Sequence, residues 1–373
     1  NRVFESGTTN FISGIFDSTN NKVVLAYQDS SNSGYASVVV CTIASNGSIS
    51  SGTPVVYASH SSGHQAIAYL GSGKVALFYK DDVGEQGGIV IGTVSGTSVG
   101  SFGTASYFST KNVRDTSVAY DTSTSRLVIA YRDGNNDKGW FVVGSVSGTT
   151  PTFGTQTYFH NAATNNGIAI TFDSNSNRIV IAYADGADSS KGKAVVGTVS
   201  GTSMSLGTEV AFEAGTTRHI GLTFDSTNNK VIVAYEDGGD SNKGKAKVGT
   251  VDSSDNSISF GSEAVFTASN SYFDPLGFPI AHDSNANKIV IVYPDEGDGF
   301  DGEFVIGTVS GTSISFSSST DFETDTVEHV ALVFDSNVNK FAIAWRDGGN
   351  SNYGTVRSLQ VAYSNTTNTL TSE

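Results

Sequence analysis

Three histidines occupy the same position of an internal repeat, and charged residues stand beside them. Imidazole, guanidinium and carboxylate groups gathered in one place can bind a polar ligand or transfer a proton. The other copies of the repeat carry Phe, Asp or Gly at that position. The candidate ligand-binding residues from this register and its neighbours are His64, Arg114, Asp115, Arg218, His219, Glu328 and His329.

A longer segment in the sixth copy, residues 270–277, adds Tyr272 and Phe273 to these candidates. It departs most from the other copies and accounts for most of the one long step between repeats. A second interpretation stays open: polar residues at the wet mouth of a channel serve solubility, and Gly or Pro accommodates variation in the loop.

An acidic loop in the sixth copy has the residue types of a cation site. Asp295, Asp298 and Asp301 lie three residues apart among several glycines. Their carboxylates could ligate Ca²⁺, which takes about six to eight oxygen ligands, although the spacing is not that of an EF-hand. We favour a hydrogen-bonded turn over a Ca²⁺ site here, and nothing in the sequence requires a cofactor.

The sequence does not specify a catalytic site. Glycosidases pair two carboxylates about 5 to 9.5 Å apart. Only Asp115 and Glu328 stand at the end of an expected inner strand, where such a pair would lie, and they belong to the third and seventh copies. The metalloprotease motif His-Glu-x-x-His is absent from the sequence. We therefore favour a non-enzymatic protein and keep a polysaccharide-acting hydrolase or lyase as the alternative.

The repeat that positions all these residues has a period of about 52 residues. An aromatic residue followed two places later by Asp recurs in steps of 52, 52, 52, 52, 58 and 52 residues. Such a period indicates a solenoid, a propeller or an array of units. The recurring aromatic residues, which we expect in the core, are Tyr27, Tyr79, Tyr131, Tyr183, Tyr235, Tyr293 and Trp345.

Each copy contains four short apolar runs separated by Gly, Asn, Asp and Ser. In the fifth copy they are residues 219–225, 230–236, 244–251 and 262–267. Runs of this length, rich in Val, Ile, Thr, Tyr and Phe, predict strands and hairpins. The sequence therefore predicts an all-β fold, a seven-bladed β-propeller with four antiparallel strands per blade, as a single domain over residues 1–373. The expected blades are approximately 11–60, 61–110, 111–162, 163–215, 216–269, 270–325, and 326–373 with 1–6.

The N-terminal residues match the fourth run of the inner copies, and the last copy ends after three runs. We expect the N-terminal strand to complete the C-terminal blade and close the ring, which removes an open sheet edge. The alternative is strand exchange between molecules, which would assemble a fibre.

The two rims of the predicted propeller differ in how strongly they repeat. Connections such as Phe224 to Lys230 recur almost unchanged, as does Val-Ser-Gly-Thr, and both fall on one rim. That rim is typical of scaffold, because Asp and Asn there satisfy tight turns. The opposite rim carries the divergent candidates described above. Small residues expected to face the central axis are Ser13, Ala66, Ser117, Ala169, Gly221, Pro279 and Ala331.

The charge of the chain limits its partners. Its 36 acidic and 21 basic residues give a net charge of −15, which disfavours nucleic acid and anionic membranes. No apolar run is long enough to predict membrane insertion. Cys41 is the single cysteine, so no internal disulfide can form, and we expect it to be a small buried side chain.

The repeat, Phe-Asp-Ser-x-x-Asn-Lys-x-Val-Ile-Ala-Tyr-x-Asp-Gly with a following Gly-Thr-Val-Ser-Gly-Thr, resembles repeats in surface and phage tail-fibre-like proteins of aquatic bacteria and their viruses. The resemblance implies a structural or adhesive module, extracellular or on a virion or cell surface, that presents its variable rim to glycans or a cell-surface protein. It brings no defined catalytic residues. Asn46 and Asn365 stand in sequons for N-glycosylation.

Overall fold

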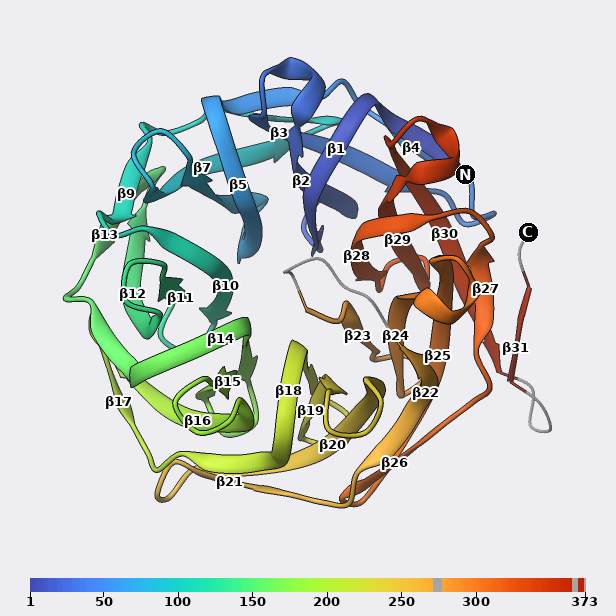
Figure 1. Cartoon of the computed structure of the whole chain (residues 1–373). Helices are drawn as coiled ribbons and strands as arrows, with labels where there is room; N and C mark the ends of the chain where they lie inside the picture. Colours follow the sequence, from blue (N-terminus) through green and yellow to red (C-terminus); the bar gives the residue numbers. More distant parts are fainter. Residues whose placement is uncertain (271–276, 364–367, 372–373) are drawn as a thin grey trace.

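The computed structural model describes residues 1–270, 277–363 and 368–371. It is an all-β fold whose sheets are arranged in chain order around a central axis, with the two ends of the chain near each other (Figure 1). We number the repeat units one to seven in the order of their recurring aromatic residues. Within the described residues, no helix is long and apolar enough to cross a membrane.

Three antiparallel strands form the main part of each unit. The first strands, which lie nearest the axis, are β1 (Arg2–Asp17), β5 (Val55–Gly71), β10 (Val113–Asp121), β14 (Thr157–Asp173), β18 (Val210–Asp225), β23 (Ile280–Asp283) and β28 (Val327–Asp335). The second strands are β2 (Lys22–Asp29), β6 (Lys74–Asp81), β11 (Arg126–Asp133), β15 (Arg178–Asp185), β19 (Lys230–Asp237), β24 (Lys288–Asp295) and β29 (Lys340–Asp347). The third strands are β3 (Tyr35–Ile43), β7 (Gln86–Ser95), β12 (Lys138–Ser147), β16 (Lys191–Ser200), β20 (Lys243–Asp252), β25 (Asp301–Ser310) and β30 (Tyr353–Tyr363).

The outermost strand of each unit is split into two halves that pair with the two ends of the third strand. One half is a short strand: β4 (Ile49–Ser51), β8 (Ser98–Gly100), β13 (Thr150–Phe153), β17 (Ser203–Leu206), β21 (Ser257–Phe260), β26 (Ser313–Phe316) and β31 (Asn368–Thr371). The other half is separate only as β9 (Ser106–Ser109), β22 (Ala264–Asn270) and β27 (Thr320–Glu323). Elsewhere it is the beginning of the next unit's long first strand, so the units run together into sheets of 13, 13 and 5 strands.

The two ends of the chain share the outermost strand of unit seven. The start of β1 pairs with β30 through Arg2↔Val356 and Val3↔Thr355, as the sequence predicts for the N-terminal strand. The far end of β30 pairs with β31, a strand that the sequence analysis did not predict. The N-terminal segment therefore supplies one half of this outermost strand and the C-terminal segment supplies the other.

The core consists of seven apolar clusters, each lying between two neighbouring units. One of them joins unit seven to unit one through residues such as Val333 and Leu25. The recurring aromatic residues Tyr27 to Trp345 are all at most 2% exposed, which confirms that they are core residues. Cys41 is also buried and free, and burial raises the pKa of its thiol to about 12.

The rim that joins first to second strands has nearly the same turn in every unit except unit two, where Gly71, Ser72 and Gly73 replace it. In unit five the Asp225 carboxylate accepts hydrogen bonds from the backbone N–H groups of Thr227 and Asn228. Asn229 then takes a left-handed conformation at φ 54°. The predicted turn chemistry is confirmed. Three short 3₁₀ turns, η1 (Ser30–Asn32), η2 (Glu296–Asp298) and η3 (Gly348–Asn350), follow second strands on the opposite rim.

Candidate functional site

The shared register of the three histidines is a β-bulge. The pairing of first and second strands is interrupted there, for example between Arg218 and Gly221 in unit five. The same break occurs in units one, two, three, four and seven. A bulge bends the strand and redirects a side chain, and such bulges are common next to binding sites.

The residue at this register has a positive φ in all seven units. Gly167 and Gly277 adopt it without steric cost, but the other five positions carry a side chain at φ 49–50°. A left-handed conformation costs a residue with a β-carbon about 1 kcal/mol or more. These five bulged residues are Phe11, His64, Asp115, His219 and His329. The side chains at this register differ between the copies, whereas the left-handed residues of the first-to-second turns are Asn or Ser.

Three bulged side chains from neighbouring units pack against each other. The Phe11 ring lies 5.2 Å from the His64 ring and 5.3 Å from the His329 ring, measured between centroids. The Nδ1 atom of His64 is buried and has no hydrogen-bond partner in the described part of the chain. Burial lowers the pKa of His64, so its imidazole is neutral at physiological pH.

The two acidic candidates are each neutralised within their own unit. Asp115 is buried and accepts a hydrogen bond of 2.7 Å from Nε of Arg132. Glu328 accepts one of 2.7 Å from Nε of Arg346. Both arginines come from the second strand, directly after the buried aromatic residue. Asp115 and Glu328 are therefore separate ion pairs rather than two members of one catalytic pair.

Unit five brings Arg218 and His219 to a third carboxylate, that of Glu236. Nη1 of Arg218 lies 3.3 Å from Oε1 of Glu236, and Nε2 of His219 lies 3.7 Å from Oε2. Glu236 is only 3% exposed, and burial raises its pKa to about 7. The exposed Arg218 guanidinium only partly offsets this effect. A hollow of about 300 Å³ lies beside Arg218 and His219 and is also lined by Asn165 and Ser190.

Among the residues that the structure describes, none that lines the channel next to the bulges is ionisable. The channel encloses about 220 Å³, and its wall is made by the residues that follow each bulge, such as Gln65, Ser117 and Ile168. All seven small residues that the sequence placed at the axis line it. The chemistry of the mouth therefore lies at the bulged rim and not within the channel.

The partners of the candidates were missed by the sequence analysis. Arg132, Glu236 and Arg346 all directly follow the recurring aromatic residue, and this shared register is the signal that could have identified them. Arg114 is exposed and packs over Gly134. Tyr272 and Phe273 lie outside the described residues, as does Asn365.

The acidic loops form the hydrogen-bonded turns favoured from the sequence. The Asp295 carboxylate accepts a hydrogen bond of 2.7 Å from the backbone N–H of Gly297. Asp237 accepts the equivalent bond from Gly239, at 2.8 Å. In residues 1–270, 277–363 and 368–371, no three Asp, Glu, His or Cys side chains converge as metal ligands. The Ca²⁺ hypothesis for Asp295, Asp298 and Asp301 stays a prediction.

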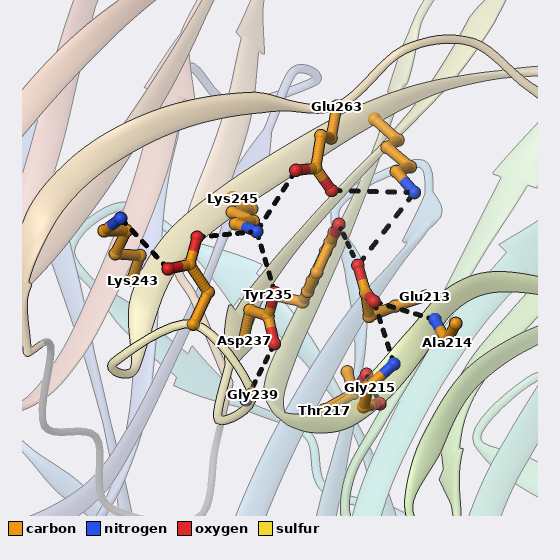
Figure 2. Close-up of polar contacts among 12 residues, drawn as sticks. Glu213, Ala214, Gly215, Thr217, Tyr235, Asp237, Gly239, Lys243, Lys245 and Glu263 are labelled. Atoms are coloured by element: carbon orange, nitrogen blue, oxygen red, sulfur yellow. Dashed lines mark hydrogen bonds and ion pairs between the residues drawn. The ribbon is translucent and has the colours of Figure 1, made fainter.

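Units four and five carry lysine networks that the sequence analysis also missed. Lys245 of unit five is buried, and its Nζ lies 2.8 Å from Asp237, 3.0 Å from Asp240 and 3.1 Å from Glu263. Figure 2 shows this ammonium between the carboxylates of Asp237 and Glu263. In unit four, Lys193 takes the same place beside Asp185, at 2.6 Å.

No protein-family model matches this chain, and no curated protein matches it either. Solved structures are similar to this chain. A Bacteroides uniformis protein provisionally described as a 6-phosphogluconolactonase matches with a TM-score of 0.55 and 11% identity, over 98% of this chain and 95% of that one. The fold is of the propeller type.

Two further structures are similar. A Lactobacillus plantarum protein matches with a TM-score of 0.51 and 14% identity, over 95% of this chain and all of that one. Trypanosoma rangeli sialidase in complex with the inhibitor DANA matches with a TM-score of 0.49 and 12% identity; the match covers 82% of this chain but 56% of the sialidase. Likenesses at these identities establish a fold and no activity.

Proposed function

We propose that this chain is a closed, seven-bladed β-propeller that acts as a non-enzymatic structural and adhesive module, with the bulged rim as its contact face. The left-handed residue beside the channel mouth carries this proposal. It recurs in all seven units, and in five of them it bears a side chain, which is Phe, His or Asp. The opposite rim repeats an Asp-based turn in every unit except unit two. A bulge whose side chain varies between copies is expected where side chains are presented to a partner.

The electrostatics of the rim favour binding over catalysis. Asp115 and Glu328 are each held by an arginine of the same unit, so neither is placed to share a proton with the other. Charged groups fixed in this way can still hydrogen-bond to a sugar or a protein surface. An extracellular, virion or cell surface fits this proposal and the resemblance of the repeat.

One observation favours the alternative of a polysaccharide-acting hydrolase or lyase. Glu236 has a pKa of about 7 and lies beside Arg218 and His219, at the edge of a hollow. A buried carboxyl with a raised pKa is suited to general acid–base chemistry.

A glycan array, read for both bound protein and released sugar, separates the two functions. The proposal expects saturable binding without release, weakened at least tenfold by His219→Ala or His329→Ala. Ser18→Ala, an exposed change on the opposite rim, is the matched control. Sugar release abolished by Glu236→Gln would replace the adhesive function with the enzyme.

Ring closure has its own test. Deleting residues 1–6 removes most of the part of β1 that pairs with β30, leaving only the Thr8↔Tyr353 pair, and removes Phe4 from the core. We expect lower stability and concentration-dependent association through the exposed edge of β30. A truncated chain that stays monomeric and keeps the wild-type melting temperature would contradict closure by this strand. Association of the full-length chain into filaments would instead favour strand exchange between molecules.

A further inference from the structure

Unit five reverses the charges of an ion pair that unit seven also contains. The residue directly before the bulge lies opposite the residue that follows the buried aromatic residue: Glu328↔Arg346 in unit seven and Arg218↔Glu236 in unit five. In unit seven the first strand carries the carboxylate and the second strand carries the guanidinium. In unit five the first strand carries the guanidinium and the second strand carries the carboxylate.

This reversal changes how many donors of the arginine the protein uses. In unit seven, Nε and Nη2 of Arg346 both donate to the Glu328 carboxylate, and the arginine side chain is 20% exposed. Arg218 contacts Glu236 and Asn242 through Nη1 alone, and its side chain is 52% exposed. In the described part of the chain, Nε and Nη2 of Arg218 therefore have no acceptor. The edge of the guanidinium that holds a carboxylate in unit seven is open in unit five.

Arg218 lines a hollow between units four and five, whose strands β14 and β18 are neighbours around the axis (Figure 1). The hollow encloses about 300 Å³, at the lower end of the usual range for ligand sites. Its lining residues are Asn165, Ser190, Thr216, Thr217, Arg218 and His219. Among the residues that the structure describes, none that lines this hollow is acidic, although the chain has a net charge of −15. The lining therefore offers cationic and hydrogen-bonding groups to a ligand.

Two backbone contacts hold the walls of this hollow together. The backbone N–H of Thr217 in unit five donates to the carbonyl oxygen of Ser190 in unit four, at 2.8 Å. A β-carbon at Gly167, the left-handed residue of unit four, would lie 3.2 Å from the backbone nitrogen of His219. The two units therefore approach closely at the bulge. A site whose walls are fixed before binding loses less entropy when it takes up a ligand.

Glu236 neutralises Arg218 only in part. Its carboxyl is buried beside Arg218 and His219, and burial raises its pKa to about 7, with a further contribution from Glu296 of unit six. At neutral pH a large fraction of Glu236 is therefore protonated and carries no charge. The guanidinium of Arg218 then keeps an uncompensated positive charge beside the hollow.

We propose that this hollow of unit five binds the carboxylate or sulfate group of an acidic glycan, with Nε and Nη2 of Arg218 donating to two of its oxygens. A planar guanidinium edge matches such an oxyanion, and charge-assisted hydrogen bonds of this kind are among the strongest in proteins. The hydroxyls and the amide of the lining are suited to the sugar ring that carries the anion. The inference rests on the proposed adhesive function for the glycan, and it names the chemical class of that glycan.

Matched acidic and neutral ligands test the site. The full chain is titrated calorimetrically with oligogalacturonate and with its uncharged methyl ester, and in parallel with a sulfated galactan oligosaccharide and its desulfated form. We expect saturable binding of at least one acidic ligand, about tenfold tighter than its neutral form and weakened by salt. Arg218→Gln should weaken this binding about tenfold. Arg114→Gln, which changes an exposed arginine at the same register of unit three, should leave it unchanged.

A variant that should gain affinity makes the test independent of damage to the fold. Glu236→Gln keeps the size of the side chain and removes the carboxylate that competes for Arg218, so at about pH 8 it should bind the acidic ligand several-fold more tightly. The proposal is overturned if neither acidic ligand binds, if the neutral forms bind equally well, if Arg218→Gln binds as the wild type does, or if Glu236→Gln binds more weakly.

The anion site and the adhesive function can fail separately. If only neutral glycans are retained on the array, the anion site is overturned and the adhesive function stands. If monomeric galacturonate binds the wild type but not Arg218→Gln, and no oligosaccharide is retained, the anion site is confirmed and the adhesive function is overturned.

Discussion

Units five and six share a backbone and differ in the charge beside their buried tyrosine. Lys245 in unit five joins three carboxylates from three segments of chain: the second strand, the following loop and the residue directly before β22. In unit six Glu303 lies opposite Asp321, and Asp301 lies near Asp298 and Asp321. The apolar core therefore recurs in both units, whereas the charge of this polar face differs in sign, because the fold does not depend on that charge.

The largest expected effect comes from removing the cation of unit five. Lys245→Ala would leave Asp237, which is buried, without its ammonium. Removing one partner of a buried ion pair costs about 3–5 kcal/mol, so we expect the free energy of unfolding to fall by about 3 kcal/mol. Urea unfolding followed by tyrosine fluorescence measures this. Lys243→Ala, which removes a half-exposed partner of Asp240, should cost below about 1 kcal/mol and is the control.

At the bulged rim of unit five, a substitution of Glu236 should instead raise the stability of the protein. The folded-state pKa of Glu236 is about 7, above its usual value, so ionising it costs stability as pH rises from about 4.5 through 7. Glu236→Gln mimics the protonated form and should stabilise the protein by about 1–3 kcal/mol at pH 8. At pH 5 the variant and the wild type should be equally stable. A variant destabilised at both values would show that the Arg218 contact outweighs burial.

The two units should also respond oppositely to acid. Hydrogen bonds from Lys243 and Lys245 lower the pKa of Asp240 below its pKa in the unfolded chain. Ionised Asp240 therefore stabilises the protein above the unfolded pKa, and this stabilisation is lost as the pH falls through the folded pKa. Burial is the main cause that raises the pKa values of Asp301 and Glu303, so their ionisation destabilises the protein and this penalty is relieved as the pH falls toward their unfolded values. Hydrogen exchange should therefore show β25 gaining protection as the pH is lowered, while β20 does not. Equal changes in the two strands would contradict this contrast.

The fold could be predicted from the sequence because its causes are local and repeated. Tyr235 and its equivalents recur at a fixed spacing, and Asp225 and Asn229 satisfy their turn from within seven residues. The bulge at His219 could not be predicted, since no local residue type demands a left-handed conformation there. Only the structure shows it.

Cross-strand partners were harder to predict for a related reason. The contacts of Asp115 with Arg132 and of Glu328 with Arg346 depend on register between strands, and the bulge shifts that register. Glu303 and Asp321 are 18 residues apart and become neighbours only through β25 and β27. The sequence analysis identified the acidic loop, but it did not identify Glu303 and Asp321 as neighbours of that loop.

The smallest expected effect tests whether unit six carries a repulsion that unit five lacks. Asp321→Asn removes one member of the Glu303↔Asp321 pair while keeping its size, and Asp321 is exposed. Cross-strand charge pairs contribute about 0.2–1 kcal/mol, so the variant should gain about 0.5 kcal/mol. Glu263→Gln in unit five removes an acid that a lysine neutralises, and it should lose stability. A gain in both variants would mean that overall charge of −15, and not the local pair, governs stability at this rim.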